Sequence, residues 1–504
     1  MSINMVATLV TFAVGLGIRF FLTPFIVGNL GAAAYGFIGL SANILSYTQL
    51  ITIALNSMAG RFITISYIEG KVDQANKYFA SVFYSNIILS IFVLLFAVVC
   101  VINLEYLIEI PAELVSDVKL LFGLLTLNSI ISLMTGVWAT ATFIKNRLDL
   151  SNIRGIIGNI LNAGSLIILF AFFTPHIWYV GFAGLILTLF ISISNFGFSK
   201  KLTPDLIVQK ANYEFKKVKE LLLSGLWNVL AKLGDLLDQG FDLLFANIFI
   251  GAVAMGYFSM AKALPFIILS LFQTIASVFA PVLTQLYAEG KRADLEIELN
   301  KTIRILGLFT SLPIVCLYVF GDSFYNLWLP SEDGHGLHVL TILGTLTIVV
   351  AMPLEALWNI FTITNKLKYS TLTMFANSIL TFSTVLCCMF IFDDAQTKLI
   401  ILASVRSFWG IIRSLTFLPM YGAYCLQLPK ASFYPPILKT LACFALSLLI
   451  CLPLRWMLTI DSWWMLIAVC SIACLICLLL GYFIILTHSD KEFLVKTIRT
   501  KLSR

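Results

Sequence analysis

Residues Leu221–Gly251 have the sequence LLLSGLWNVLAKLGDLLDQGFDLLFANIFIG. This stretch exceeds the roughly 20 apolar residues that cross a bilayer, yet it carries Lys232, Asp235, Asp238 and Asp242. At about 100° per residue, these four side chains lie on one face of a helix. Charges at membrane depth cost about 2.5–3.5 kcal/mol each, so they normally face a protein interior or an aqueous cavity. The stretch predicts a membrane helix with a functional polar face.

The composition extends this interpretation to the whole chain. Of the 504 residues, 60% are hydrophobic and 12% are charged, which excludes an ordinary soluble protein. The ten cysteines lie in or beside apolar segments, and we expect them to be packing residues. The net charge of +7 suits basic cytosolic loops and gives no indication of nucleic-acid binding. Without a Walker loop, metal-ligand spacing or catalytic cluster, we expect no enzyme activity, no bound metal and no cofactor.

Apolar segments predict fourteen membrane helices. They cover residues 5–28, 33–57, 79–102, 118–144, 153–174, 177–198, 221–249, 254–284, 302–320, 338–364, 371–391, 399–423, 437–459 and 463–487. Of the 33 lysines and arginines, 25 fall in the loops after even-numbered helices or in the C-terminal tail. The positive-inside rule therefore predicts that both termini are cytosolic.

Three short motifs occur twice. Their matching copies are LGAAAYGF (30–37) with IGAVAMGY (250–257), YIEGK (67–71) with YAEGK (287–291), and NRL (146–148) with NKL (365–367). The first two pairs have the same separation along the chain, and the third pair has nearly the same one. Each copy contains six helices, an even number, so we expect parallel repeats related by an axis along the membrane normal.

The predicted fold is therefore an all-α integral membrane protein with two parallel six-helix repeats and two further helices. The expected domains are an N-terminal six-helix lobe (1–198), a cytosolic linker (199–220), a second six-helix lobe (221–424), helices 13 and 14 (437–487) and a basic cytosolic tail (488–504). The tail is expected either to lie on an anionic leaflet as an amphipathic helix or to be disordered.

Charged residues inside the predicted helices form two chemical groups. The basic candidates for substrate binding are Arg19, Lys262, Arg406 and Arg413. Guanidinium groups bind phosphate oxygens in a bidentate manner, so the arginines are suited to clamp a phosphate or pyrophosphate. The candidates for cation coupling are Asp235, Asp238, Asp242 and Glu355, with Asn377 as a neutral oxygen ligand. Buried carboxylates are suited to bind H⁺ or Na⁺.

A structural alternative stays open for these charges. They would then neutralise one another in interhelical salt bridges that only hold the bundle together. Lys232 and Asp235, which lie close together on one helix, fit this alternative best.

With these features, the chain resembles the multidrug/oligosaccharidyl-lipid/polysaccharide exporter superfamily, and more narrowly the Wzx-type polysaccharide flippases that move O-antigen or other repeat units. The resemblance rests on the fourteen helices with cytosolic termini, on Arg19 followed by Leu30–Gly36, and on FDLLFANIFIGAVAMGYFSMAKAL (241–264). Within the last segment, the family pattern D, G, G, Y and S is matched by Asp242, Gly251, Gly256, Tyr257 and Ser259.

The resemblance implies two lobes around a central cavity in the bacterial inner membrane. It also implies transfer of an undecaprenyl-pyrophosphate-linked oligosaccharide from the cytosolic to the periplasmic leaflet, coupled in some relatives to a cation or to the membrane potential. Membrane lipids and the polysaccharide polymerase and glycosyltransferases of the same pathway are the implied partners. In the related lipid II flippases, an arginine resembling Arg19 holds the pyrophosphate.

Two other transport functions stay open, a cation-coupled multidrug antiporter and a lipid II flippase. Multidrug exporters tend to carry a carboxylate in helix 1, which this chain lacks, although Asp242 and Glu355 resemble a cation site in some of them. A membrane glycosyltransferase or polymerase is a third class. It is disfavoured because the predicted outer loops are short and contain no catalytic-looking cluster.

Overall fold

The computed structural model describes residues 2–145, 147–239, 241–277, 279–364, 366–487 and 491. Within the described residues all regular secondary structure is helical. Twelve of the helices are long and apolar enough to cross a membrane, so the chain is a multi-pass membrane protein. Three predicted site residues, Arg19, Asp235 and Asp238, have side chains that lie outside the described part of the chain.

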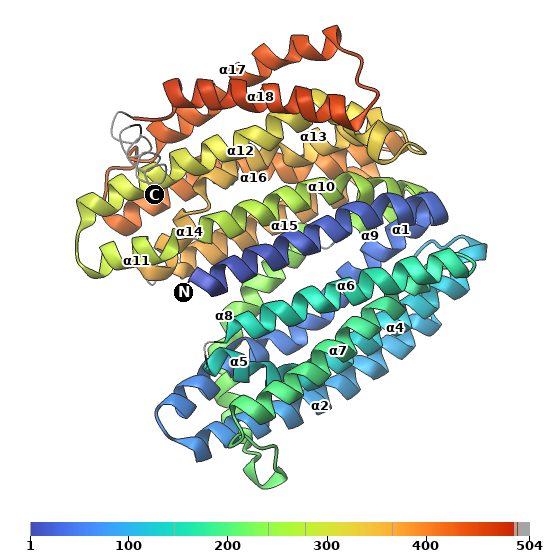
Figure 1. Ribbon diagram of the computed structural model, residues 1–504, viewed down its shortest axis with the longest axis vertical. Helices are drawn as coiled ribbons and strands as arrows, with labels where there is room; N and C mark the ends of the chain where they lie inside the picture. The colour runs from blue at the N-terminus through green and yellow to red at the C-terminus, as the bar shows by residue number, and fades with distance from the viewer. Residues whose placement is uncertain are drawn as a thin grey trace. The chain divides into compact units, whose positions relative to one another are not determined.

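The chain divides into two compact units, Met1–Ser259 and Met260–Arg504. The first unit contains α1 (Ser2–Ile68), α2 (Val72–Ile102), α3 (Leu104–Leu107), α4 (Val115–Thr135), α5 (Thr140–Ile144), α6 (Leu148–Phe172), α7 (Trp178–Leu202), α8 (Phe215–Gln239) and α9 (Asp242–Phe249). In this unit α1 packs against α2, α6 and α8, and α4 lies beside α2 and α7 (Figure 1).

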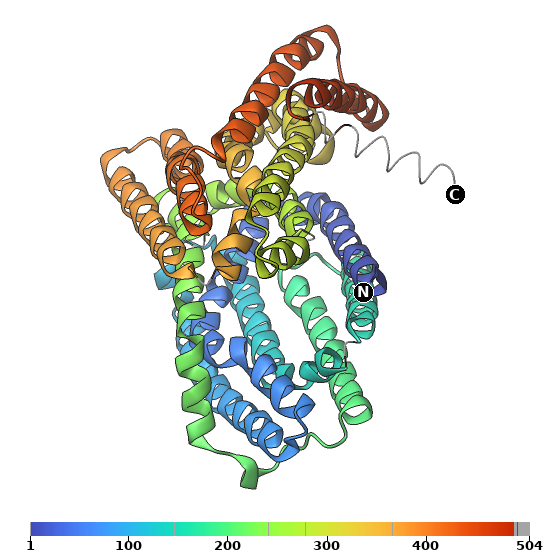
Figure 2. The same cartoon turned by 90° about the vertical axis from the view of Figure 1, so that its left-hand side faces the viewer.

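The boundary between the units falls within α10 (Ala252–Ser277). The second unit continues with α11 (Ala280–Ala288), α12 (Arg292–Trp328), α13 (Gly334–Ala351), α14 (Leu357–Ile363), α15 (Leu367–Ile391), α16 (Ala395–Leu426), α17 (Tyr434–Met457) and α18 (Trp463–Ile484). Here α12 packs against α13, α17 and α18, and α16 packs against α13 and α15 (Figures 1 and 2).

The difference between fourteen predicted and twelve observed spans has two local causes. Predicted segments 5–28 and 33–57 both lie in α1, which is interrupted at Gly31 (φ 80°, ψ 173°). The charged segment 221–249 is divided between α8 and α9, and neither is among the twelve apolar spans. The number fourteen, the two repeats and the predicted lobe boundaries stay predictions.

Two turns on the predicted cytosolic side have the same construction. Gly70 (φ 76°) follows α1, and Gly290 (φ 71°) follows α11. Only glycine adopts this left-handed conformation without steric cost, which explains its use after a helix end. In both turns the next residue is a lysine that pairs with the glutamate before the glycine, at 2.7 Å for Lys71 and 2.8 Å for Lys291.

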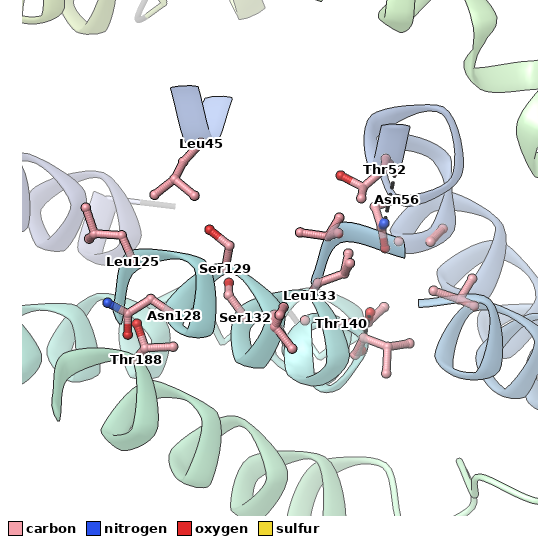
Figure 3. Close-up of a pocket in the computed structure, with 18 residues that line it drawn as sticks. Leu45, Thr52, Asn56, Leu125, Asn128, Ser129, Ser132, Leu133, Thr140 and Thr188 are labelled. Carbon is pink, nitrogen blue, oxygen red and sulfur yellow. Dashed lines mark hydrogen bonds between the residues drawn. The ribbon is translucent and has the colours of Figure 1, made fainter. Parts of the chain in front are cut away.

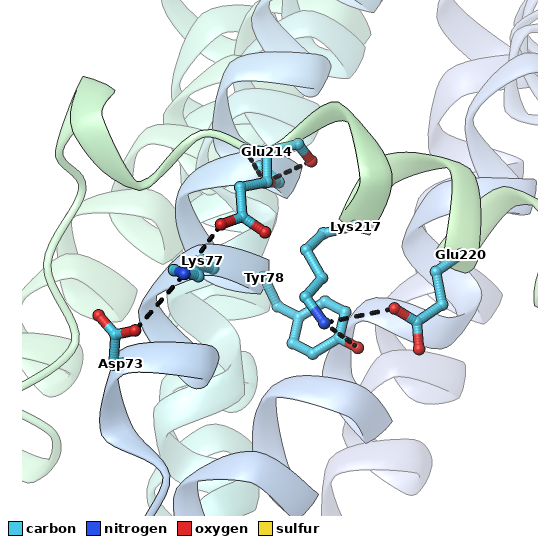
Figure 4. Close-up of polar contacts among 7 residues, drawn as sticks. Asp73, Lys77, Tyr78, Glu214, Lys217 and Glu220 are labelled. Atoms are coloured by element: carbon cyan, nitrogen blue, oxygen red, sulfur yellow. Dashed lines mark hydrogen bonds and ion pairs between the residues drawn. The ribbon is translucent and has the colours of Figure 1, made fainter.

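The segment between α7 and α8 is fastened to the N-terminal end of α2 (Figure 4). The Lys77 ammonium lies 2.8 Å from the Glu214 carboxylate, and the Glu214 backbone N–H donates to Ser81 Oγ at 2.9 Å. The Lys217 ammonium donates to the Tyr78 hydroxyl at 3.1 Å. The hydrogen bond from Lys77 lowers the pKa of Glu214 below its usual value. Residues of the predicted linker are thus held against α2 within the first unit.

Candidate functional site

The first unit contains a partly open cavity of about 650 Å³ (Figure 3). Its walls come from α1, α2, α4, α5, α7 and the short 3₁₀ turn Gly136–Ala139. The 18 lining residues that the structure describes are all uncharged. Their polar members are Thr52, Asn56, Asn128, Ser129, Ser132, Thr140 and Thr188. A volume of this size lies within the range of small-molecule sites.

Helical spacing brings the polar side chains of the cavity together. Thr52 and Asn56 are one turn apart on α1, and Ser129 and Ser132 are close to one turn apart on α4. Residues with this spacing share a helix face. Figure 3 shows both serines on the side of α4 that faces Leu45 of α1.

One wall of the cavity is fixed by a pair of asparagines. Asn56 and Asn86 exchange side-chain hydrogen bonds of 3.0 and 2.9 Å, and Asn86 also donates to the Leu133 carbonyl at 3.0 Å. On α4, Asn128 donates to the Gly181 carbonyl at 3.1 Å. The Asn128 side-chain oxygen is buried and accepts no hydrogen bond from the described residues. Because this atom is shielded from solvent, a ligand hydroxyl would satisfy it only after rotation of the Asn128 side chain.

In the second unit, two of the predicted site residues are brought together. The charge of Arg413, on α16, interacts electrostatically with the carboxylate of Glu355. The Arg413 guanidinium carbon also lies 5.9 Å from the centre of the Trp358 ring, within the range of a cation–π interaction. We call Glu355, Trp358 and Arg413 the charged cluster.

A break between two helices positions the charged cluster. The 3₁₀ turn Met352–Leu354 separates α13 from α14, and Pro353 within it cannot donate a backbone hydrogen bond. Glu355 follows directly, and its carbonyl accepts from the Trp358 N–H at 3.2 Å. Close packing of α13 and α16 is possible because a Cβ on Gly410 would lie 2.5 Å from Thr347 Oγ1.

Asp242 occupies the first position of α9 and is 7% exposed. It interacts electrostatically with Tyr47 of α1, whose ring is stacked on Phe241 at a centroid distance of 5.2 Å. A carboxylate at the N-terminus of a helix is favoured by the helix dipole. Asp242 belongs to the first unit and Glu355 to the second.

The other described candidates lie on separate helices. Lys262 is on α10, Asn377 on α15 and Arg406 on α16. Lys262 and Arg406 are partly buried, and Asn377 is 9% exposed. The roles assigned to these residues stay predictions.

Sequence reasoning missed both the neutral cavity and Trp358. Serine, threonine and asparagine occur throughout apolar helices, so no single one of them draws attention. The available signal was their clustering in LNSIIS (127–132) on one predicted helix and in TIALN (52–56) on another. Trp358 follows Glu355 by about one helical turn and could have been found by helical spacing.

The fold and the polar cavity define a helical membrane protein with an uncharged, partly open cavity in its first unit. The chain belongs to the polysaccharide biosynthesis protein family, which matches residues 29–331. A protein of Bacillus subtilis (strain 168), the uncharacterized membrane protein EpsK, is 27% identical over 500 residues, which are 99% of this chain and 98% of that protein.

Solved structures show the same fold. A multidrug resistance MATE family transporter of the MOP superfamily, inward-facing, matches with a TM-score of 0.65 and 14% identity over 83% of this chain and 94% of its own. The lipid II flippase MurJ, in an inward closed conformation, matches with a TM-score of 0.64 and 15% identity, over 95% and 98% of the two chains.

Proposed function

We propose that this protein is a flippase that moves a polyprenyl-pyrophosphate-linked oligosaccharide from the cytosolic to the periplasmic leaflet by alternating access. The observation that carries the proposal is the uncharged polar cavity of the first unit, in a member of a polysaccharide biosynthesis family. Sugar hydroxyls donate and accept hydrogen bonds, and the hydroxyl and amide groups of this cavity do the same. In this proposal the protein is a carrier and performs no enzymatic step.

The lining of the cavity argues against cationic drugs as the substrate. A cationic compound in a low-dielectric site requires a carboxylate or an aromatic face to compensate for its lost hydration. The described lining of this cavity contains neither a carboxylate nor an aromatic ring. A multidrug antiporter is therefore the second candidate. It predicts export of cationic dyes, which the transport assay below distinguishes from movement of the oligosaccharide.

In the proposal, basic residues bind the pyrophosphate. Arg406 and Arg413 are two turns apart on α16 and share a face. Arg19 and Lys262 are the other residues proposed to bind phosphate. A diphosphate that approaches Arg413 would compete with the Glu355 carboxylate for the same guanidinium group.

This competition offers a mechanism for coupling. When Arg413 turns to the diphosphate, Glu355 loses its compensating charge and takes up a proton or a sodium ion. The substrate and the cation would then each change the affinity for the other, as alternating access requires. The remaining proposed cation ligands are Asp235, Asp238, Asp242 and Asn377.

Two parallel repeats are part of the proposal. The glycines with positive φ in the described part of the chain form two pairs of equal separation, Gly31 with Gly251 and Gly70 with Gly290. The helices α6 and α15 have the same length and begin at the equivalent leucines of the NRL and NKL motifs. A Cβ on Gly36 would lie 2.7 Å from the Cα of Gly256, its counterpart in the other repeat. Contacts between equivalent residues are expected where a two-fold axis crosses an interface, which supports this arrangement.

The proposed setting is the bacterial inner membrane, with both termini in the cytosol. Glycosyltransferases would build the lipid-linked oligosaccharide on the cytosolic face, and a polymerase would use it on the other. The distribution of lysine and arginine supports this orientation.

Transport by the full-length protein in proteoliposomes tests the proposal. Lipid-linked oligosaccharide is incorporated on one side, and its arrival on the other is measured by access to a soluble glycosidase. Ser129→Trp, which places a bulky ring in the cavity, should reduce the rate at least tenfold, whereas Ser129→Ala should not. Export of cationic dyes without movement of the oligosaccharide would overturn the proposal in favour of the antiporter.

A further inference from the structure

A second hollow, in the second unit, lies between α15 and α16. This aromatic groove has a volume of about 570 Å³ and is lined by Tyr369, Leu372, Thr373, Ala376, Phe417, Tyr421 and Tyr424. Phe417 and Tyr424 both stack on Tyr421, with centroid distances of 4.9 and 5.9 Å. The Tyr421 hydroxyl donates to the Lys366 carbonyl at 2.7 Å. The rings are thus held in place from both helices.

The ammonium groups of two lysines lie beside the groove. The Lys366 ammonium lies 4.7 Å from the centre of the Tyr424 ring, and the Lys368 ammonium lies 5.9 Å from that of Tyr369. Among the described residues, neither ammonium has a carboxylate within ion-pair distance. Tyr369 and Tyr424 are 58% and 63% exposed, so both rings are accessible from outside the unit.

The matching segment in the first unit shows that this charge is not required by the fold. When the NKL motif is aligned with NRL, Lys366 corresponds to Arg147 and Lys368 to Asp149. Arg147 and Asp149 pair at 2.9 Å and cancel. The corresponding position in the second unit therefore carries two positive charges where the first carries no net charge.

The exposed tyrosine at the start of α15 is also specific to the second unit. In the same alignment, Tyr369 and Thr373 correspond to Leu150 and Arg154. Arg154 is hydrogen-bonded to Asn195 and Ser151 within the first unit. The start of α15 therefore combines an exposed tyrosine with two lysines, a combination that the start of α6 lacks.

We propose that the aromatic groove binds an anionic phospholipid of the cytosolic leaflet, with its phosphate between Lys366 and Lys368 and an acyl chain along the tyrosine rings. Basic residues attract anionic headgroups on that side of the membrane. Aromatic rings with an apolar body and a polar tip are suited to the interface between headgroup and chain. The site is separate from the proposed sugar cavity and does not depend on which substrate is transported.

Native mass spectrometry of the purified full-length protein with phosphatidylglycerol and phosphatidylcholine tests this site. The double variant K366Q/K368Q should bind phosphatidylglycerol at least tenfold more weakly than the wild type. The matched control K71Q/K291Q removes two lysines that pair with glutamates in the turns after α1 and α11. This control should bind phosphatidylglycerol as the wild type does. K366R/K368R keeps the charge and should retain the lipid.

Four results would overturn the proposal. The first is unchanged phosphatidylglycerol binding by K366Q/K368Q, and the second is equal retention of phosphatidylcholine by the wild type. The third is displacement of the lipid by millimolar inorganic phosphate, which would make the groove a site for free anions. Loss of binding in K366R/K368R, with an unchanged melting temperature, would also contradict a charge-based site.

Discussion

The cavity of the first unit and the charged cluster of the second unit both hold polar groups inside an apolar bundle, but with different chemistry. The cavity is lined by hydroxyls and amides, whereas the cluster holds Glu355 and Arg413 in electrostatic contact. A neutral group without a partner costs far less than an unpaired charge. Neutral polar side chains can therefore line an unoccupied cavity at little cost, whereas buried charged residues require a compensating charge whether or not a ligand is bound.

Reversing one charge of the charged cluster should have the largest effect on transport. Arg413→Glu would replace the electrostatic attraction between Arg413 and Glu355 by repulsion between two carboxylates in an apolar bundle. We expect oligosaccharide transport to fall more than 100-fold, measured in proteoliposomes with equal amounts of inserted protein. Arg413→Lys is the control and should retain part of the activity. A double exchange, E355R/R413E, that is no more active than R413E would contradict a direct pairing.

Substrate binding in the uncharged cavity of the first unit is tested at Asn128. Replacement by leucine removes the buried oxygen proposed to accept a substrate hydroxyl, and a lost hydrogen bond of this kind costs about 1–3 kcal/mol. We expect the apparent substrate affinity to fall about 5- to 100-fold, with little change in the maximal transport rate. An affinity equal to that of the wild type would show that the sugar binds elsewhere.

The wall of the cavity is tested through stability. Asn56→Ala would leave Asn86, which is fully buried, without its reciprocal partner. The expected loss is about 1–3 kcal/mol in the free energy of unfolding, measured as a lower melting temperature in detergent. Asn103→Ala is the control, because Asn103 is exposed and its side chain donates to the nearby Val99 carbonyl. Equal melting temperatures for the two variants would contradict the prediction.

The smallest effect is expected at the exposed Lys77–Glu214 pair. Because the pKa of Glu214 is lowered, its contribution to stability is present above the unfolded value of about 4.3 and disappears as the pH falls through the lower folded value. Glu214→Gln should therefore lower the melting temperature slightly at pH 7, and this difference should shrink as the pH falls below about 4.3. A difference between the two proteins that does not change with pH would contradict the role of the ion pair.

Helices could be predicted from the sequence where apolar residues continued for a full span. The prediction 371–391 falls inside α15, and 399–423 falls inside α16. The prediction 302–320 was too short, because α12 begins at Arg292. Leu295 and Leu299, one turn apart, bury one face of this polar extension, and a helix that packs by one stripe carries no continuous apolar signal.

The sequence singles out candidate residue types, but it does not reveal which of them become neighbours. Glu355 and Arg413 were selected because charges are rare within apolar segments, yet they were assigned to different roles. Their contact depends on how α16 is rotated against the turn after α13, which sequence spacing within one helix does not reveal. The cavity was missed for the opposite reason, since its neutral side chains resemble those of any packed helix.

The sequence by itself determined the membrane setting, the long helices and the uneven charge of the loops, because hydration costs act on each residue separately. The tertiary structure decided which polar groups meet. It placed Arg413 beside the Trp358 ring and within electrostatic reach of Glu355, and it collected hydroxyls and amides around one cavity. These outcomes depend on contacts between helices that are far apart in the chain, and such contacts are fixed only when side chains pack in three dimensions.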